Sequence, residues 1–414
     1  MLQQHSGNET TIKLPFAFIL AGLAALILSQ VLLLMHGDLV SEGVFRIPPI
    51  WSSAHLLLLG WALMTAMGAM YQLVPVAFLT PIWSEKFGYV QFAATFLGIG
   101  IFSVMLYLNP PKAFLPGVLA LAGILMFLFQ MFMTLKKQAK PNILTLFVGT
   151  ALICLLATIV LGIMMAWFIK TGDGANFYKP VFNSHLLLGT AGWFTLLIFG
   201  FSYKMVPMFS LSHGYEMKTA KIVYAIYSLG LAVLLVSFWL GNGLATSVGL
   251  VMLALGFTLF GWHIKHIISK RIKKKLDKPF VFALCGIAFG AAIHLAVLAA
   301  WISGDFSSWI GPLLYLYIFL WIALSILGYL YKIVPFLWWT HKYSGEIGKK
   351  AVPSLKDMVS DKSAVPFFLM LAAGSLIVFC SMLTKTASLF YIGQAAVSVS
   401  LLAMSATIIL VLKK

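Results

Sequence analysis

Long apolar runs separated by short polar loops dominate the pattern of this 414-residue chain. Twelve runs reach the length of about 20 residues that a helix needs to cross the hydrocarbon core of a bilayer. They cover residues 14–35, 54–80, 87–108, 113–135, 142–169, 182–208, 220–240, 243–263, 279–302, 309–338, 365–384 and 388–411. Backbone polar groups in lipid must bond within their own segment, so the pattern predicts an all-α polytopic membrane protein with about 12 transmembrane helices.

The apolar runs also repeat in groups of four. The phrase Trp-x6-Gly-x-x-Tyr-x-x-Val-Pro lies in the second run of each group, at 61–75, 193–207 and 321–335, with its prolines 132 and 128 residues apart. This spacing predicts a single membrane domain over 1–414, built from three four-helix repeats in a pseudo-threefold arrangement. The repeats are expected to cover 14–135, 142–263 and 279–411.

The distribution of charge predicts which loops of the chain face the cytoplasm. Only 9% of the residues are charged and 61% are hydrophobic, yet the net charge is +17 because lysine gathers in alternate loops. The positive-inside rule then predicts cytoplasmic N and C termini and cytoplasmic loops at 264–278 and 339–364. A basic rim of this kind accounts for the charge, so no nucleic-acid partner is expected, and the 264–278 cluster suits anionic lipid head groups.

Histidine is the ionisable residue type that enters the apolar runs in a pattern. All eleven carboxylates lie in termini, loops or span ends, whereas His55, His185 and His294 lie within spans at one predicted depth, on the outer side. Neutral imidazole is the commonest protein ligand for metals and heme iron, so these three are predicted to bind a cofactor. His36 is a fourth candidate on the same side. The remaining histidines are expected to be solvated or interfacial: His5, His213, His263, His266 and His341.

Two features of these helices leave alternatives open. Small residues share a helical face with histidine, and they either form a slot for a flat porphyrin or let two helices pack closely. The groups are His185 with Gly189 and Gly192, and His294 with Gly286 and Gly290. Relative to its tryptophan, His185 also lies two residues earlier than His55, which turns a helix by about 200°. A bulge or a different partner is needed to reconcile the two positions.

The stretch 53–61, Ser-Ala-His-Leu-Leu-Leu-Leu-Gly-Trp, and its echo from His185 to Trp193 resemble the low-spin-heme helix of divergent heme–copper oxidases and nitric oxide reductases. Twelve spans in three arcs with both ends cytoplasmic is also the architecture of their catalytic subunit. The resemblance implies a multi-pass protein of a prokaryotic cytoplasmic membrane that binds heme b, with or without copper. In this respect the chain resembles the NnrS-type membrane proteins linked to the nitric oxide response.

The chain departs from that family in its ligand set. The tenth span has Tyr315 and Tyr317 where the family has His-x-His, and the seventh span has no histidine pair for copper. Oxygen reduction at the usual binuclear centre is therefore not expected. What remains is one heme held by two of His55, His185 and His294, or one copper ion held by all three. For a heme, the resemblance makes Arg46, with Lys170 and Lys179, partners for the propionates.

The sequence thus predicts a heme-binding membrane protein that handles electrons or a diatomic gas such as nitric oxide, with the bilayer and an electron-donor or respiratory subunit as partners. No catalytic residue is assigned, and any enzymatic role would be that of an oxidoreductase other than a conventional terminal oxidase. Two alternatives stand beside this function: a transporter or channel for a metal ion or small solute, and a non-catalytic scaffold subunit of a respiratory complex.

Overall fold

The protein is an all-helical bundle of the polytopic membrane type, as the apolar pattern predicts. The computed structural model describes residues 11–138 and 140–414, and in this part of the chain twelve helices are long and apolar enough to cross a membrane. Nine of these spans are single helices. They are α1 (Lys13–Met35), α5 (Glu85–Leu108), α6 (Phe114–Leu135, preceded by η2, Pro110–Ala113), α7 (Ile143–Thr171), α10 (Lys218–Leu240), α11 (Gly243–Ser269), α12 (Lys278–Ile302), α15 (Asp361–Thr384) and α16 (Ala387–Val411).

The other three spans are longer and each is interrupted by a π-helical segment. The π segments carry wider turns than the α-helix and occur in proteins mostly as short insertions at functional sites. The second span runs through α3 (Pro48–His55), η1 (Leu56–Leu63) and α4 (Met64–Phe78). The sixth runs through α8 (Ala175–Leu187), η3 (Leu188–Phe194) and α9 (Thr195–Ser210), and the tenth through α13 (Phe306–Leu316), η4 (Tyr317–Ala323) and α14 (Leu324–Tyr343).

These three spans begin earlier than hydropathy predicts. Helix starts at Pro48, Ala175 and Phe306 extend the expected limits of 54, 182 and 309, because polar first turns hide the helix from an apolar window. Proline at the first turn of α3 favours helix there, since its missing N–H has no intrahelical partner in any case. The short helix α2 (Gly37–Ser41) and the turns η5 (Ser344–Glu346) and η6 (Leu355–Asp357) complete the described elements.

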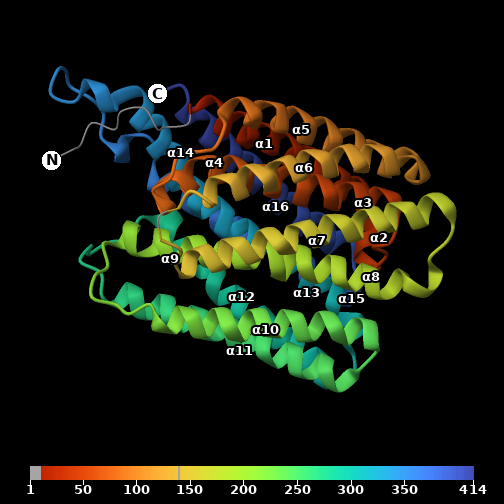
Figure 1. Cartoon of the computed structure of the whole chain (residues 1–414). Coiled ribbons are helices and arrows are strands. Elements are labelled where there is room, and N and C mark those ends of the chain that lie inside the picture. Colours follow the sequence, from red (N-terminus) through yellow and green to blue (C-terminus); the bar gives the residue numbers. More distant parts are fainter. Residues whose placement is uncertain (1–10, 139) are drawn as a thin grey trace.

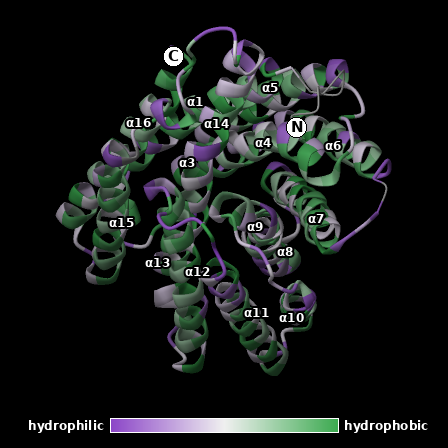
Figure 2. Ribbon diagram, turned by 90° about the vertical axis from the view of Figure 1, so that its left-hand side faces the viewer, coloured by the Kyte–Doolittle hydropathy of each residue, from purple (hydrophilic) through white to green (hydrophobic). Residues whose placement is uncertain are grey.

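The start of α1 and the C-terminal end of α16 lie at one end of the bundle (Figure 1), here termed the lysine-rich end. It carries the loops before α7, α10, α12 and α15 and the last residues of the chain, with Lys136, Lys218, Lys273, Lys356 and Lys414 among their lysines. The helices are green along their length and purple residues gather at their ends (Figure 2), so the hydropathy of the bundle matches a bilayer with polar rims.

The three interrupted spans form the most buried part of the bundle. Trp61, Trp193 and Trp321, which stand in corresponding places of the repeated phrase, are all 1% exposed or less. Aromatic packing continues from them, since Phe199 stacks on Phe260 with ring centroids 3.7 Å apart and meets Trp321 edge-on. The centre of the bundle is therefore a filled aromatic core rather than an open pore.

Hydrogen bonds between buried amides join the first span to the last. Gln394 of α16 donates to the side-chain oxygen of Gln30 in α1 at 2.7 Å and accepts from the Tyr315 hydroxyl of α13 at 2.7 Å. Ser398 completes the group with longer contacts of 3.4 Å to both glutamines. Because all four residues are buried, water cannot replace these bonds.

Replacing Gln394 by leucine is expected to lower the free energy of unfolding by about 1 kcal/mol, which is typical for side-chain hydrogen bonds between membrane helices. The substitution leaves the Gln30 and Tyr315 polar groups without their partner. Unfolding in mixed detergent micelles measures the effect. The matched control is Ser398→Ala, which removes only the longer contacts and is expected to cost less. Equal stability of Gln394→Leu and the unaltered protein would contradict this account.

Candidate cofactor site

His55 and His185 face one another between two of the interrupted spans. Their imidazole ring centroids are 6.3 Å apart and the ring planes are tilted by 33°. Both side chains are half-buried, and they lie on α3 and α8, far from the lysine-rich end (Figure 1). Two residues that are 130 positions apart in the sequence are thus brought together at one depth.

The main chain fixes the tautomer of both rings. His55 Nδ1 lies 2.7 Å from the carbonyl oxygen of Trp51, and His185 Nδ1 lies 2.9 Å from the carbonyl oxygen of Thr158. A carbonyl oxygen only accepts hydrogen bonds, so each Nδ1 carries the proton and donates it. In the neutral rings the lone pair is then on Nε2, and neither Nε2 takes part in a hydrogen bond with the described residues. Metal-ligating histidines usually have this arrangement.

The packing around the pair holds each ring in place. Phe102 of α5 meets the His55 ring edge-on, with centroids 5.2 Å apart. On the other side, Gly162 of α7 makes room for His185: a methyl group at this glycine would lie 3.1 Å from the His185 Cε1 atom. The sequence pattern did not indicate the residues that hold the two rings. Phe102 contributes a ring contact, Thr158 a main-chain carbonyl and Gly162 the space for the His185 ring.

A π-helical segment follows each histidine closely. The segment η1 begins directly after His55, and η3 begins three residues after His185. Wider turns change the direction in which later residues point, so they alter the phase between each histidine and its tryptophan. The two rings lie side by side despite the two-residue offset seen in the sequence, and a π segment stands between each histidine and the end of its span.

His294 lies in a different environment from this pair. Its Nδ1 donates to the Gly290 carbonyl at 2.7 Å, and its Nε2 lies 3.3 Å from the Tyr227 hydroxyl. Its ring packs against Phe257 and Tyr317, with centroids 4.4 and 5.5 Å away. Both ring nitrogens are therefore engaged within the protein. The expected grouping of His294 with His55 and His185 does not appear in these contacts.

His36 also lies apart from the pair. Its ring is 6.1 Å from that of Tyr107, and its Nε2 is buried without a hydrogen-bond partner. Among the described residues, no group of three or more His, Cys, Asp or Glu side chains is arranged to hold a metal ion. The copper site of three imidazoles that the sequence suggested is thus not assembled, because His294 is committed to Gly290 and Tyr227.

Of the three cations proposed to bind propionates, Arg46 lies near the histidine pair. Its guanidinium is 4.7 Å from the ring centre of Phe182, which is one helical turn from His185. Lys170 instead lies over Phe114 and Trp167, at 5.1 and 5.4 Å from the ring centres, and Lys179 is exposed. Arg46 therefore packs on α8 one turn before His185, whereas Lys170 packs on other aromatic rings.

The small residues beside the histidines serve helix packing. A methyl group at Gly192 would lie 2.9 Å from Cys154 of α7, and one at Gly290 would lie 2.2 Å from the Phe257 ring. Gly189 and Gly286 likewise contact Thr158 and Ser325 at 3.1 Å in the same construction. These glycines were expected either to leave a slot for a porphyrin or to let two helices pack closely. The contacts of the four glycines correspond to close helix packing.

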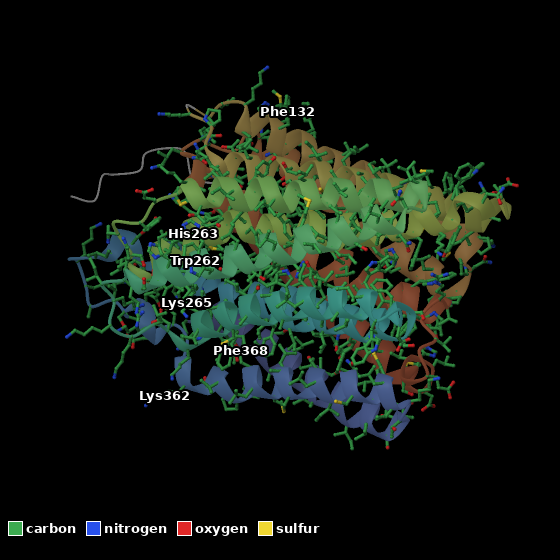
Figure 3. The ribbon with its side chains drawn as sticks, turned by 90° about the horizontal axis from the view of Figure 1, so that it is seen from below. Phe132, Trp262, His263, Lys265, Lys362 and Phe368 are labelled. Atoms are coloured by element: carbon green, nitrogen blue, oxygen red, sulfur yellow. The ribbon has the colours of Figure 1, made fainter. Side chains whose placement is uncertain are left out.

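His263 differs from its expected solvated state. It is 1% exposed within α11, and its ring nitrogens lie 3.2 Å from the Tyr203 hydroxyl and 3.0 Å from the Glu216 carbonyl. Figure 3 shows it toward the lysine-rich end, near Trp262 and Lys265. Its place at the end of an apolar run suggested an interface, but the loop before α10 folds back over it. His213 and His341 are exposed, while His5 is outside the described residues.

An apolar cavity of about 520 Å³ lies beside the site, between α1, the second span and α5. Ser52 and Leu56, which flank His55 in sequence, line it, whereas His55 itself does not. Comparison with known proteins adds no relative: no protein-family model matches the sequence, and no curated protein is recognisably similar to it.

Proposed function

We propose that the protein is a membrane electron-transfer protein that binds one heme b between His55 and His185. The observation that supports this proposal is the pair of facing imidazoles with main-chain-bonded Nδ1 atoms and unbonded Nε2 atoms. An Nε2 atom that makes no hydrogen bond keeps its lone pair available, and neutral imidazole with this free nitrogen is a common metal ligand.

The spacing of the rings fits ligation from opposite sides of one metal. An imidazole nitrogen at about 2 Å from a metal puts its ring centre about 3.2 Å away, so two opposed imidazoles have ring centres about 6.4 Å apart. The observed separation is 6.3 Å. The supporting carbonyls of Trp51 and Thr158 are of the kind that orient metal-bound histidine.

The number of protein ligands favours heme over a bare metal ion. Copper or zinc sites in proteins usually take three or four protein ligands, and the described residues gather no such group of His, Cys, Asp or Glu. Heme supplies four in-plane nitrogens itself, so two imidazoles complete the coordination of its iron. A porphyrin with propionates also gives Arg46 an acidic partner.

Two axial imidazoles favour electron transfer over the binding of a gas. If His55 and His185 both bound the heme iron, no position would remain for a diatomic molecule, and the protein would supply the two ligands and the surroundings of a redox change. Handling of nitric oxide, which the resemblance to NnrS-type proteins suggests, then requires one of these histidines to leave.

An optical spectrum of the purified protein tests the proposal. We expect a Soret band that sharpens and shifts on reduction with dithionite, with one iron per chain by elemental analysis. Carbon monoxide added to the reduced protein is expected to leave the spectrum unchanged, because no axial position is free. A colourless protein that contains copper or zinc would contradict the heme and favour the metal-transport alternative, while a colourless, metal-free protein would favour the scaffold alternative.

Arg46→Ala is expected to weaken heme retention about tenfold while leaving the spectral signature of two imidazoles intact. One charge-assisted hydrogen bond to a carboxylate is worth roughly 1.5–3 kcal/mol, and the axial ligands are untouched. Transfer of heme to excess apomyoglobin measures the loss rate. The control is Lys112→Ala, an exposed cation in η2 that makes no contact with the pair. Equal loss rates in both variants would remove Arg46 from the site.

The proposed function is linked to the repeat structure, the membrane orientation and the ancestry of the chain. We infer that the three interrupted spans mark three four-helix repeats, that both termini lie in the cytoplasm of a prokaryote, and that the chain is a divergent relative of the heme–copper oxidase superfamily. Support comes from the Trp-to-Pro phrase with its π segment in each of the three spans, and from the lysines gathered at one end of the bundle.

A further inference from the structure

A second cavity, of about 210 Å³, opens at the lysine-rich end and is independent of the histidine pair. Three segments far apart in the sequence form it. Lys273 and Asp277 come from the loop before α12, Lys332 comes from α14, and Lys356 comes from the turn η6. Leu355 and Val359 add an apolar wall. We refer to this site as the lysine cavity.

The lysine cavity holds more positive than negative charge. Asp277 is its one lining carboxylate, and it accepts hydrogen bonds from both Lys273, at 3.0 Å, and Lys332. Burial raises the pKa of Asp277, but the hydrogen bonds and charges of Lys332 and Lys273 outweigh it and hold that pKa below its ordinary value. Two lysines contact this carboxylate, which stays ionised at neutral pH, and Lys356 is a third, exposed lysine of the lining. The described lining residues therefore carry an excess of two positive charges.

Two of the charged side chains that line the cavity are partly buried, which reduces the screening of their charge by salt. The side chains of Lys332 and Asp277 are 21% and 13% exposed, so bulk salt screens them less than it screens the outer lysines. The neighbouring carboxylate Asp357 does not line the cavity, because Ser354 binds it through its main-chain N–H at 2.8 Å and its hydroxyl at 2.7 Å. Among the side chains that the structure describes, Asp277 is therefore the one counter-ion that lines the cavity.

Main-chain contacts hold the three segments in place without help from a ligand. Ile272 N–H donates to the Leu211 carbonyl at 3.1 Å, which fixes the loop that carries Lys273. The indole N–H of Trp339 donates to the Pro353 carbonyl at 2.7 Å, which ties the segment before η6 to α14. Met358, the residue after η6, is 1% exposed and anchors that turn in the bundle.

We propose that the lysine cavity binds a phosphate group. A phosphate carries one or two negative charges and several acceptor oxygens, which matches the excess charge and the ammonium donors of Lys273, Lys332 and Lys356. The same chemistry comes from an anionic phospholipid head group or from a soluble phosphate. This site is separate from the proposed heme, and its occupancy does not depend on His55 or His185.

Thermal unfolding of the full-length protein in a neutral detergent, with added ligand, tests the proposal. The two probes are inorganic phosphate and short-chain phosphatidylglycerol, each titrated until the unfolding temperature stops rising. A saturable rise with phosphatidylglycerol alone identifies a lipid head group, and a rise with both identifies a soluble phosphate as a competent ligand. No saturable rise with either probe would overturn the proposal.

Opposite shifts from two variants make the test specific. Lys332→Gln is expected to weaken the apparent affinity about fivefold, the effect of one lysine near an anionic head group, and Asp277→Asn is expected to strengthen it by a similar factor. Matched controls are Lys218→Gln and Glu216→Gln, an exposed ion pair of 3.4 Å at the same end but outside the cavity. Controls that shift affinity as much as the cavity variants would reduce the effect to general surface charge and refute the site.

Discussion

Alanine at either His55 or His185 is expected to reduce the heme content of the purified protein about tenfold or more. Each substitution removes one of the two nitrogens proposed to bind the heme iron, and the described residues provide no third histidine beside the pair that takes its place. The measurement is the Soret absorbance per mole of protein, with iron analysis in parallel. The partner histidine is then left with an unsatisfied Nε2, so a double variant is expected to lose little more than either single one.

Two controls and one conservative variant separate ligation from folding. His294→Ala and His36→Ala remove histidines that lie apart from the pair, so both are expected to retain the heme. His185→Met keeps a ligand for iron and is expected to retain heme with a raised reduction potential, because methionine paired with histidine favours the reduced state. Full heme content in His55→Ala and His185→Ala would refute the site, and loss only in His294→Ala would move it elsewhere.

Substitution of Gly98 by alanine is expected to destabilise the bundle by about 3 kcal/mol, the upper end for overpacking a filled interface. A methyl group at Gly98 would lie 2.4 Å from the main-chain nitrogen of Ala120 and 2.6 Å from its Cα, so α5 and α6 must separate to admit it. Main-chain atoms cannot move aside as a flexible side chain does. Detergent unfolding and the yield of monodisperse protein measure the effect, and valine is expected to prevent folding.

Gly100 provides the matched control on the same helix. A methyl group there meets nothing within 4 Å, so Gly100→Ala is expected to change stability by about 0.5 kcal/mol or less. The two variants share residue type, helix and depth, and differ only in what faces them. Equal stability of Gly98→Ala and Gly100→Ala would show that the contact between α5 and α6 has been misjudged.

Hydropathy alone predicted twelve spans, and the structure has twelve such helices in the described residues. A helix that crosses a bilayer needs about 20 apolar residues in a row, and such a run is visible in the sequence itself. Hydropathy placed His55, His185 and His294 at one depth but not on one face, since depth depends on distance along a helix and facing depends on its rotation. His185 lies near the beginning of the sixth span and His294 near the end of the ninth, so both lie at similar distances from the end of the bundle opposite the lysines. Tyr227 engages the Nε2 of His294, whereas the Nε2 of His185 is left unbonded beside His55.

The positions of the three π segments could not be predicted from the sequence for a different reason. The segments η1, η3 and η4 consist largely of buried apolar residues, and no residue type in Leu56–Leu63 distinguishes such a turn from an α-helix. The burial of His263 could not be predicted either, because the loop before α10 covers it through the Glu216 carbonyl. This burial arises from a tertiary contact that a local pattern does not contain.

The bond between Gln30 and Gln394 sets an order for biogenesis. The two amides are 364 positions apart, so α1 enters the membrane long before the ribosome has made its partner in α16. Until then the Gln30 side chain has no Gln394 to meet, and the young protein exposes a polar group where lipid should lie. The contact that joins the first span to the last can therefore form only after α16 has entered the bundle.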